Sequence, residues 1–102
     1  MTPILARHQV ELEVLCRRHR VRRLELFGSA ASGGYEEGRS DYDFLVEFEP
    51  LPSGAYADAY FGLLEGMEGL LGHPVDLVVA SAIRNPYFRD AVERTKIPVY
   101  GA

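Results

Sequence analysis

Two aspartates have the type and spacing needed to bind a metal ion. Asp41 and Asp43 open a run of mainly apolar residues that extends to position 48. If this run is a β-strand, residues two apart project to the same face, with Cα atoms roughly 6.5 Å apart. Mg²⁺ prefers one or two carboxylates together with phosphate oxygens. The pair therefore indicates magnesium and phosphate chemistry, whereas the alternative is an Asx-type turn with two solvated carboxylates.

A third aspartate, Asp76, lies inside a second apolar run at residues 74–79. A carboxylate in a buried strand is costly unless it is paired or binds a metal. Three carboxylates from two adjacent strands could hold two metal ions ~3.5–4 Å apart, the spacing that activates a nucleophile and stabilises a leaving phosphate. The alternative is a strand exposed on one face, with Asp76 solvated or paired to an arginine.

A glycine–serine step, Gly28-Ser29, precedes the first aspartate pair. Glycine allows the backbone to approach a phosphate closely. Free N–H groups that follow it can form an anion-binding nest, and the Ser29 hydroxyl can donate to a phosphate oxygen. The dipeptide taken alone is also typical of a plain turn.

The elements that must position these residues alternate between helix and strand. The apolar spacing, caps and breakers predict helices at about 3–20, 55–71 and 86–95 and strands at 23–27, 41–49, 74–79 and 97–100. The strand at 41–49 has one fully apolar face, and the strand at 97–100 is expected at a sheet edge because of Pro98. The helix at 55–71 is expected to present one apolar stripe, made of Tyr56, Tyr60, Leu63, Leu64, Met67, Leu70 and Leu71. The pattern favours an α/β (α+β) fold, a small mixed β-sheet with helices packed on it.

Composition limits the class of protein. A chain of 102 residues with 47% hydrophobic and 25% charged residues predicts one globular domain. Its net charge of −4 argues against direct nucleic-acid binding. The basic cluster at 17–23 is interpreted as a solvated helix end, the alternative being a docking patch for an acidic partner or RNA. The single cysteine, Cys16, is expected to be a buried thiol, and the absence of an apolar run of ~18 residues predicts a cytoplasmic protein.

Three pieces of the sequence occur in an order that resembles a known family. They are Leu26-Phe27-Gly28-Ser29, then Ser40-Asp41-Tyr42-Asp43-Phe44-Leu45-Val46-Glu47-Phe48, then Pro74-Val75-Asp76-Leu77-Val78. Together they resemble the minimal nucleotidyltransferase (MNT) family of the DNA polymerase β-like superfamily, over nearly the whole chain. The resemblance implies the nucleotidyltransferase fold.

The resemblance also implies roles for these residues. Gly28, Ser29, Arg39 and Ser40 would bind the nucleotide, with Arg39 replacing a basic residue that usually follows the glycine–serine step. Three carboxylates would hold two Mg²⁺ ions and form the catalytic site, namely Asp41, Asp43 and Asp76. The reaction implied is transfer of AMP from ATP to a hydroxyl. The acceptor implied is a tyrosine of a HEPN-type helical toxin, for which the chain would be the antitoxin.

Two alternatives to this activity follow from the sequence. The residues after Ser29 are Ala30, Ala31 and Ser32, where the family usually has basic side chains. This difference favours a catalytically weak or inactive antitoxin that neutralises its partner by binding alone. A nucleotide-sugar transferase with an Asp-x-Asp metal site is disfavoured, because such domains usually need a much longer chain. The sequence leaves open the preferred nucleotide, the acceptor and an assembly of identical chains.

Overall fold

The computed structural model describes residues 3–28, 31 and 42–101 of the chain. Its helices are α1 (Pro3–Arg7), α2 (Gln9–Arg18), α4 (Ala55–Leu71), the 3₁₀ turn η1 (Ala80–Ala82) and α5 (Pro86–Thr95). Its strands are β1 (Val21–Phe27), β2 (Tyr42–Phe48), β3 (Val75–Val79) and β4 (Ile97–Tyr100). Within the described ranges, no helix is long and apolar enough to cross a lipid bilayer.

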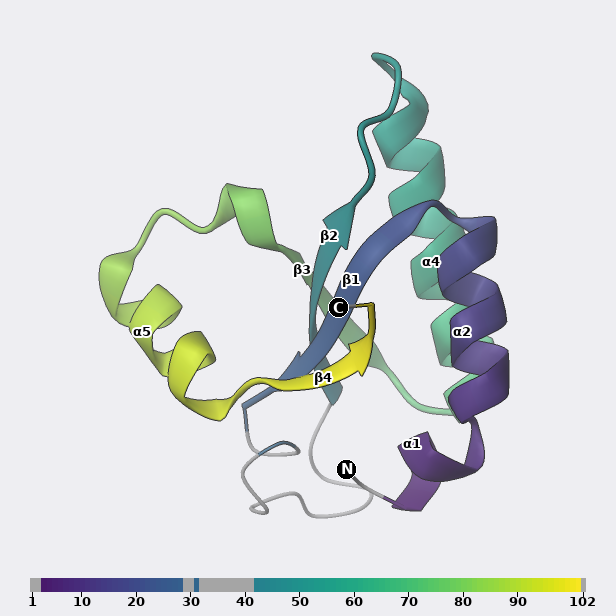
Figure 1. Ribbon diagram of the computed structural model, residues 1–102, viewed down its shortest axis with the longest axis horizontal. Helices are drawn as coiled ribbons and strands as arrows, with labels where there is room; N and C mark the ends of the chain where they lie inside the picture. Colours follow the sequence, from purple (N-terminus) through teal and green to yellow (C-terminus); the bar gives the residue numbers. More distant parts are fainter. Residues whose placement is uncertain (1–2, 29–30, 32–41, 102) are drawn as a thin grey trace.

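The four strands form one mixed sheet in the order β3-β2-β1-β4. β1 runs antiparallel to both β2 and β4, and β2 runs parallel to β3. β4 therefore lies at an edge of the sheet, as Pro98 predicts. The predicted fold class, a small mixed sheet with helices packed on it, is confirmed (Figure 1).

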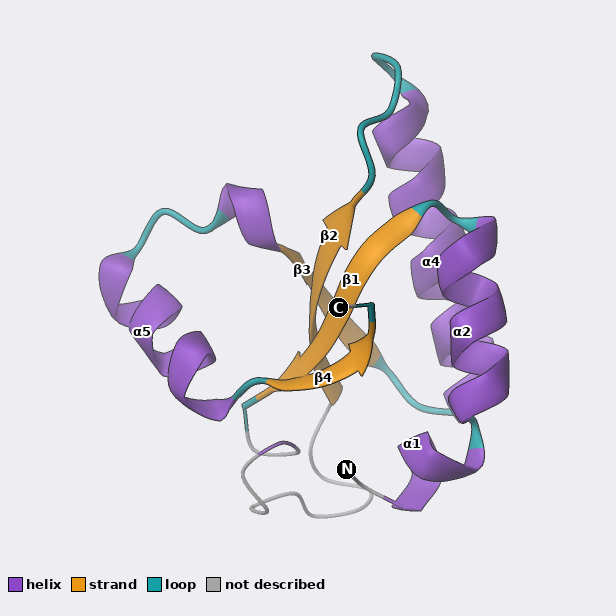
Figure 2. Ribbon diagram, viewed as in Figure 1, coloured by secondary structure: helices purple, strands orange, loops and turns teal. Residues whose placement is uncertain are grey.

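Helices α2 and α4 pack side by side on one face of the sheet and enclose the main core (Figure 2). β2 contributes alternate side chains to this core, because successive residues of a strand point to opposite faces. Tyr42, Phe44 and Val46 are at most 2% exposed, and they pack with Leu63 and Met67 of α4. We call this side of the sheet the covered face and the opposite side, which carries Asp43, Leu45 and Glu47, the open face.

The bounds of α4 and α5 agree with the sequence predictions, but three other details are wrong. The predicted helix at 3–20 is interrupted at His8, whose ψ of 20° lies outside the α-helical range. β1 begins at Val21 rather than at residue 23, because Val21 is buried and pairs with Phe48. On α4, the predicted apolar stripe is wrong only at Tyr56, which is 45% exposed, while the buried Ala59 takes a place in it.

Candidate metal and nucleotide site

The two described aspartates of the predicted metal site lie side by side. Asp43 of β2 and Asp76 of β3 are register partners in the parallel pair. Paired residues of neighbouring parallel strands project to the same face, and such strands lie about 4.8 Å apart. Asp76 is exposed, whereas its neighbours Val75 and Leu77 are buried toward the helices. Both carboxylates therefore stand on the open face, as the sequence predicts.

Helix α4 fixes the backbone on both sides of Asp76. The Val75 N–H donates to Glu68 Oε2 at 3.0 Å. The Tyr60 hydroxyl donates to the Leu77 carbonyl oxygen at 2.6 Å. These two bonds hold the five-residue strand β3 against α4. They therefore fix the position of the Asp76 backbone relative to the helix. Neither bond is predicted from the sequence, because each joins α4 to a residue of a separate strand.

Gly28 lies at the end of β1, directly after Phe27, the residue that pairs with Asp43. Its φ of 74° is in the left-handed region, where side chains are rarely tolerated. A Cβ atom added to Gly28 would lie 2.7 Å from Asp43 Oδ2. Glycine is therefore required for two reasons, the backbone conformation and the closeness of the Asp43 carboxylate.

The end of α5 holds the Gly28 backbone in place. The Gly28 N–H donates to Thr95 Oγ1 at 3.0 Å, and the Thr95 hydroxyl in turn donates to the Ala91 carbonyl at 3.0 Å. No local pattern marks Thr95 for this role, because the contact joins residues 67 positions apart. The Gly28 N–H is thus already bonded within the protein, so any phosphate contact from this bend would have to come from the residues that follow it.

Four of the predicted site residues lie outside the described part of the chain. They are Ser29, Arg39, Ser40 and Asp41. Their roles remain predictions. In the ranges the structure describes, no three His, Cys, Asp or Glu side chains cluster closely enough to hold a metal ion. The described part supplies two carboxylates, and their hard oxygen donors beside a residue without a side chain suit Mg²⁺.

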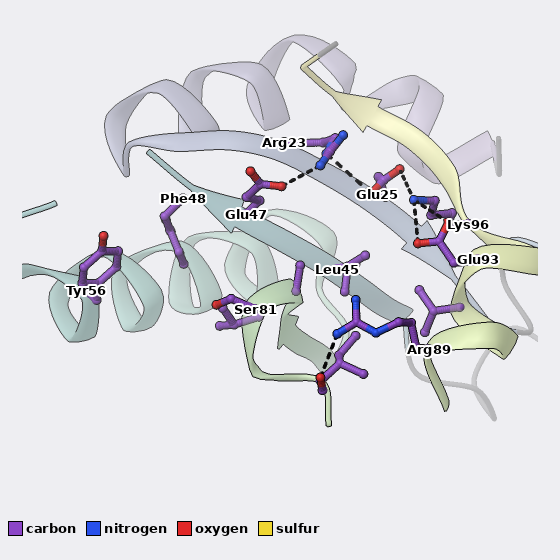
Figure 3. A pocket seen from close by; sticks show the side chains of 14 residues that line it. Arg23, Glu25, Leu45, Glu47, Phe48, Tyr56, Ser81, Arg89, Glu93 and Lys96 are labelled. Carbon is purple, nitrogen blue, oxygen red and sulfur yellow. Dashed lines mark hydrogen bonds and ion pairs between the residues drawn. The ribbon is translucent and has the colours of Figure 1, made fainter. Parts of the chain in front are cut away.

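A cleft of about 490 Å³ opens on the same face of the sheet (Figure 3). Its floor includes Leu45 of β2. One side is formed by the segment around η1, including Ser81 and Ile83, and the other by Arg89 and Val92 of α5. No local pattern in the sequence predicts this cleft, because its lining comes from elements far apart in the chain.

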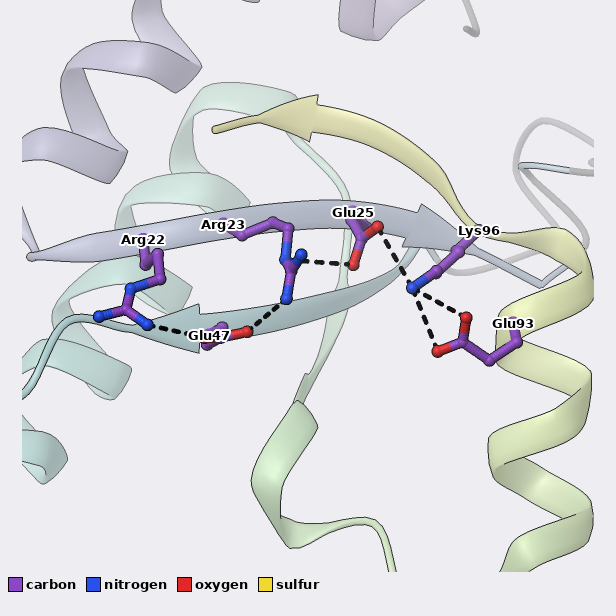
Figure 4. A network of polar contacts seen from close by, with 6 residues as sticks. All are labelled: Arg22, Arg23, Glu25, Glu47, Glu93 and Lys96. Carbon is purple, nitrogen blue, oxygen red and sulfur yellow. Dashed lines mark hydrogen bonds and ion pairs between the residues drawn. The ribbon is translucent and has the colours of Figure 1, made fainter. Parts of the chain in front are cut away.

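A row of charged side chains crosses the open face at this cleft (Figure 4). Arg23 of β1 donates to Glu47 of β2 at 2.6 Å, and its Nε lies 3.8 Å from Glu25. Lys96 lies 3.6 Å from Glu25 and 3.0 Å from Glu93. The hydrogen bond from Arg23 lowers the pKa of the Glu47 carboxyl, and the bond to Glu93 raises the pKa of Lys96.

The basic cluster at 17–23 is thus only partly a helix end. Arg17 and Arg18 do lie exposed in the last turn of α2. Arg22 and Arg23 instead belong to β1, and both pair with Glu47. The interpretation of the whole cluster as a solvated helix end is wrong, because the chain turns at Arg20, whose φ is 61°, and enters the sheet.

Known proteins resemble this chain in sequence and in fold. Residues 11–99 match the family described as nucleotidyltransferase domain. The chain is 40% identical to the protein adenylyltransferase MntA of Thermococcus cleftensis over 82 residues, which cover 80% of this chain and 76% of that one.

Two solved structures have a similar fold. One, assigned provisionally as a minimal nucleotidyltransferase, is 36% identical, covers 92% of this chain and 91% of its own, and superposes with a TM-score of 0.75. The other contains a tri-AMPylated HEPN toxin of Shewanella oneidensis in complex with its MNT antitoxin. The matched chain is 18% identical over 96% of this chain and 73% of its own, with a TM-score of 0.64, so it supports the fold alone.

The family match and the two close relatives confirm the family resemblance and the enzyme class predicted from the sequence. The chain belongs to the nucleotidyltransferase domain family.

Proposed function

We propose that the chain is a Mg²⁺-dependent nucleotidyltransferase that transfers AMP from ATP to a tyrosine hydroxyl of a HEPN-type helical toxin, and so acts as the antitoxin. One observation carries the proposal, namely that Asp43 and Asp76 are register partners on the open face. Gly28 abuts the Asp43 carboxylate and leaves room beside it. We further propose that residues 1–102 work as a single domain in the cytoplasm.

Each site residue has a role in this reaction. Asp41, Asp43 and Asp76 would hold two Mg²⁺ ions, which would supply positive charge to the triphosphate and to the acceptor hydroxyl. The bend at Gly28 and Ser29, with Arg39 and Ser40, would bind the triphosphate. These groups gain their effect by orienting the reacting atoms and by opposing the negative charge that develops.

The chemical step is an in-line displacement at the α-phosphorus of ATP. The acceptor oxygen forms a bond to this phosphorus while the bond to the β-phosphate oxygen breaks, and pyrophosphate leaves. Asp76, which is exposed, would accept the proton of the acceptor hydroxyl. The products are an adenylylated tyrosine and pyrophosphate.

The named relatives support the choice of donor and acceptor. A relative 40% identical carries the name protein adenylyltransferase, and a structural neighbour was solved with an AMPylated HEPN toxin. Neither comparison bears on the metal, so Mg²⁺ rests on the chemistry of the two carboxylates.

Co-expression with the product of the neighbouring reading frame, followed by mass spectrometry of both chains, tests the proposal. The partner should gain about 329 Da for each AMP transferred. Asp43→Asn should abolish the gain, and Asp58→Asn, which changes an exposed carboxylate on α4, should preserve it. An unmodified partner in the presence of the wild-type chain, ATP and Mg²⁺ would contradict the proposal.

A second function remains a candidate because Ala30, Ala31 and Ser32 replace the usual basic residues after Ser29. Each missing charge-assisted phosphate contact would weaken nucleotide binding by roughly 1.5–3 kcal/mol. In this alternative the chain neutralises its toxin by binding alone. Asp43→Asn would then leave neutralisation intact in a growth assay, whereas the enzymatic antitoxin would lose it.

A further inference from the structure

The cleft on the open face begins one strand step from the catalytic carboxylates. Asp43, Leu45 and Glu47 alternate along β2 on the same face, and each two-residue step covers about 7 Å. Leu45 and Glu47 both line the cleft. A molecule that is bound at the carboxylates and extends along β2 would therefore lie in the cleft.

The cleft continues into a second, mainly apolar hollow of about 420 Å³ beside α4. The two hollows share Phe48, Tyr56, Val79 and Ser81. Phe61, which is 63% exposed, extends the apolar lining at the far end. Together they form one trough that runs from beside the catalytic carboxylates to the start of α4.

Arg89 in this cleft bonds to a backbone carbonyl, whereas Arg23 and Lys96 pair with carboxylates. Its Nη2 donates to the Ile83 carbonyl at 2.8 Å, and Figure 3 shows the guanidinium reaching from α5 toward Leu45. Among the described residues no carboxylate forms an ion pair with Arg89, whereas Arg23 and Lys96 each bind two glutamates. The Arg89 guanidinium therefore has further N–H groups with which it can bind an incoming molecule.

We propose that this trough binds the acceptor polypeptide in an extended conformation, with an acidic side chain two residues from the acceptor tyrosine paired to Arg89. Side chains two apart in an extended chain project to the same side with about 7 Å between them. That spacing matches the step from Asp43 to Leu45, the residue toward which Arg89 reaches. The inference rests on the proposed function, because it places the acceptor hydroxyl at Asp43 and Asp76.

The trough favours an extended peptide over the donor nucleotide for two reasons. It begins along β2, at Leu45 and Glu47, and its far end is apolar and aromatic. A backbone with alternating side chains fits such a surface, with an apolar residue of the peptide lying against Phe48 and Tyr56.

NMR titration of the ¹⁵N-labelled full chain tests the inference without ATP or metal. The probes are the heptapeptide Ala-Ala-Tyr-Ala-Glu-Ala-Ala, its reversed sequence, and matched peptides with Gln in place of Glu. We expect amide shifts at Leu45, Ser81 and Val92, and about fivefold tighter binding of the Glu peptide in at least one chain direction. Arg89→Gln should remove this preference, because glutamine carries no charge.

Two control variants separate charge recognition from structure. Arg89→Lys should keep the preference for Glu, and so should Arg94→Gln, which removes an exposed cation of α5 paired with Asp90. Equal affinity for the Glu and Gln peptides, or shifts centred on Val10 and Val14 of α2, would overturn the inference. The inference would also be overturned if ATP alone caused the same amide shifts in the cleft and Arg89→Gln abolished them. The cleft would then be the binding site of the nucleotide.

The titration is independent of catalysis. A chain that binds the peptide but transfers no AMP would refute the proposed function and keep the binding site. A chain that transfers AMP to its partner but shows no charge preference through Arg89 would refute only the inference.

Discussion

The two faces of strand β2 differ in almost every respect although they are built from alternate residues. Tyr42, Phe44 and Val46 are buried on the covered face under α2 and α4. On the open face, Asp43 adjoins Asp76, and Glu47 belongs to a row of ion pairs. The covered face supplies the main apolar core, which holds the strand in place. The open face supplies charge beside a smaller apolar cluster, in which Leu45 packs with Ile83 and Val92. The comparison suggests that changes on one face should affect stability and changes on the other should affect chemistry.

The largest expected loss of stability comes from the covered face. Phe44→Ala removes a fully buried aromatic ring, which typically costs about 3–5 kcal/mol. Urea unfolding monitored by circular dichroism should show a correspondingly lower midpoint. A loss below about 1 kcal/mol would mean that this face is not the main source of stability.

Gly28→Ala should affect both stability and activity, because Gly28 has a constrained backbone conformation and also touches the Asp43 carboxylate. The left-handed φ should cost about 1–2 kcal/mol of stability. The new Cβ should also displace the Asp43 carboxylate, so AMP transfer should fall by more than the stability loss explains. Gly72→Ala is the matched control, because Gly72 has a φ of 65° and nothing within 4 Å of the added Cβ. Equal transfer by the two variants would show that the contact with Asp43 is unimportant.

Cys16, in the core under the covered face, and Glu47, on the open face, should respond to pH with opposite sign. Burial raises the pKa of Cys16, on the covered face, from 9.0 to about 12. Its neutral thiol contributes stability that is complete below pH 9 and is lost as pH rises toward 12. At pH 10 the loss should be about 1.4 kcal/mol. Glu47 has a lowered pKa, so its contribution is present above about pH 4.5 and is lost as pH falls.

Unfolding of wild type and Cys16→Ala between pH 7 and 10 checks the alkaline side of this prediction. The free energies of unfolding of the two proteins should converge by about 1.4 kcal/mol as pH rises from 7 to 10. Parallel curves would show that the thiol is not protected from ionisation.

Tyr60→Phe tests whether the covered face positions the open one. It removes the hydrogen bond to the Leu77 carbonyl, next to Asp76, and should cost about 1 kcal/mol. AMP transfer should fall modestly, because β3 is held less firmly. Tyr87→Phe is the control, since Tyr87 is 85% exposed and lies outside both the trough and the contact with β3. Equal transfer rates for the two variants would show that Tyr60 does not position Asp76.

The sequence predicts most of the fold because local signals are strong there. Asn85 followed by Pro86 marks the start of α5, and its side chain does accept bonds from Tyr87 and Phe88 N–H. Alternation along β2 predicts which residues are buried. The interruption at His8 escapes prediction because the apolar spacing of Leu5 and Leu12 continues across it.

The candidate site is predicted only in part. The apolar run around Asp76 places this carboxylate in a strand, but its register against Asp43 depends on tertiary pairing. The contacts of Thr95 with Gly28 and of Lys96 with Glu25 join distant parts of the chain, and no periodicity reports them. The cleft is missed for the same reason.

Transfer rates of Asp43→Asn, Asp76→Asn and the double variant test the central claim most directly. If the two carboxylates serve one metal site, each single change should lower AMP transfer by at least about 10³-fold, and the double variant should be hardly slower than either. Losses that multiply in the double variant, or a single variant within threefold of the wild-type rate, would contradict the account, because the two aspartates would then act separately.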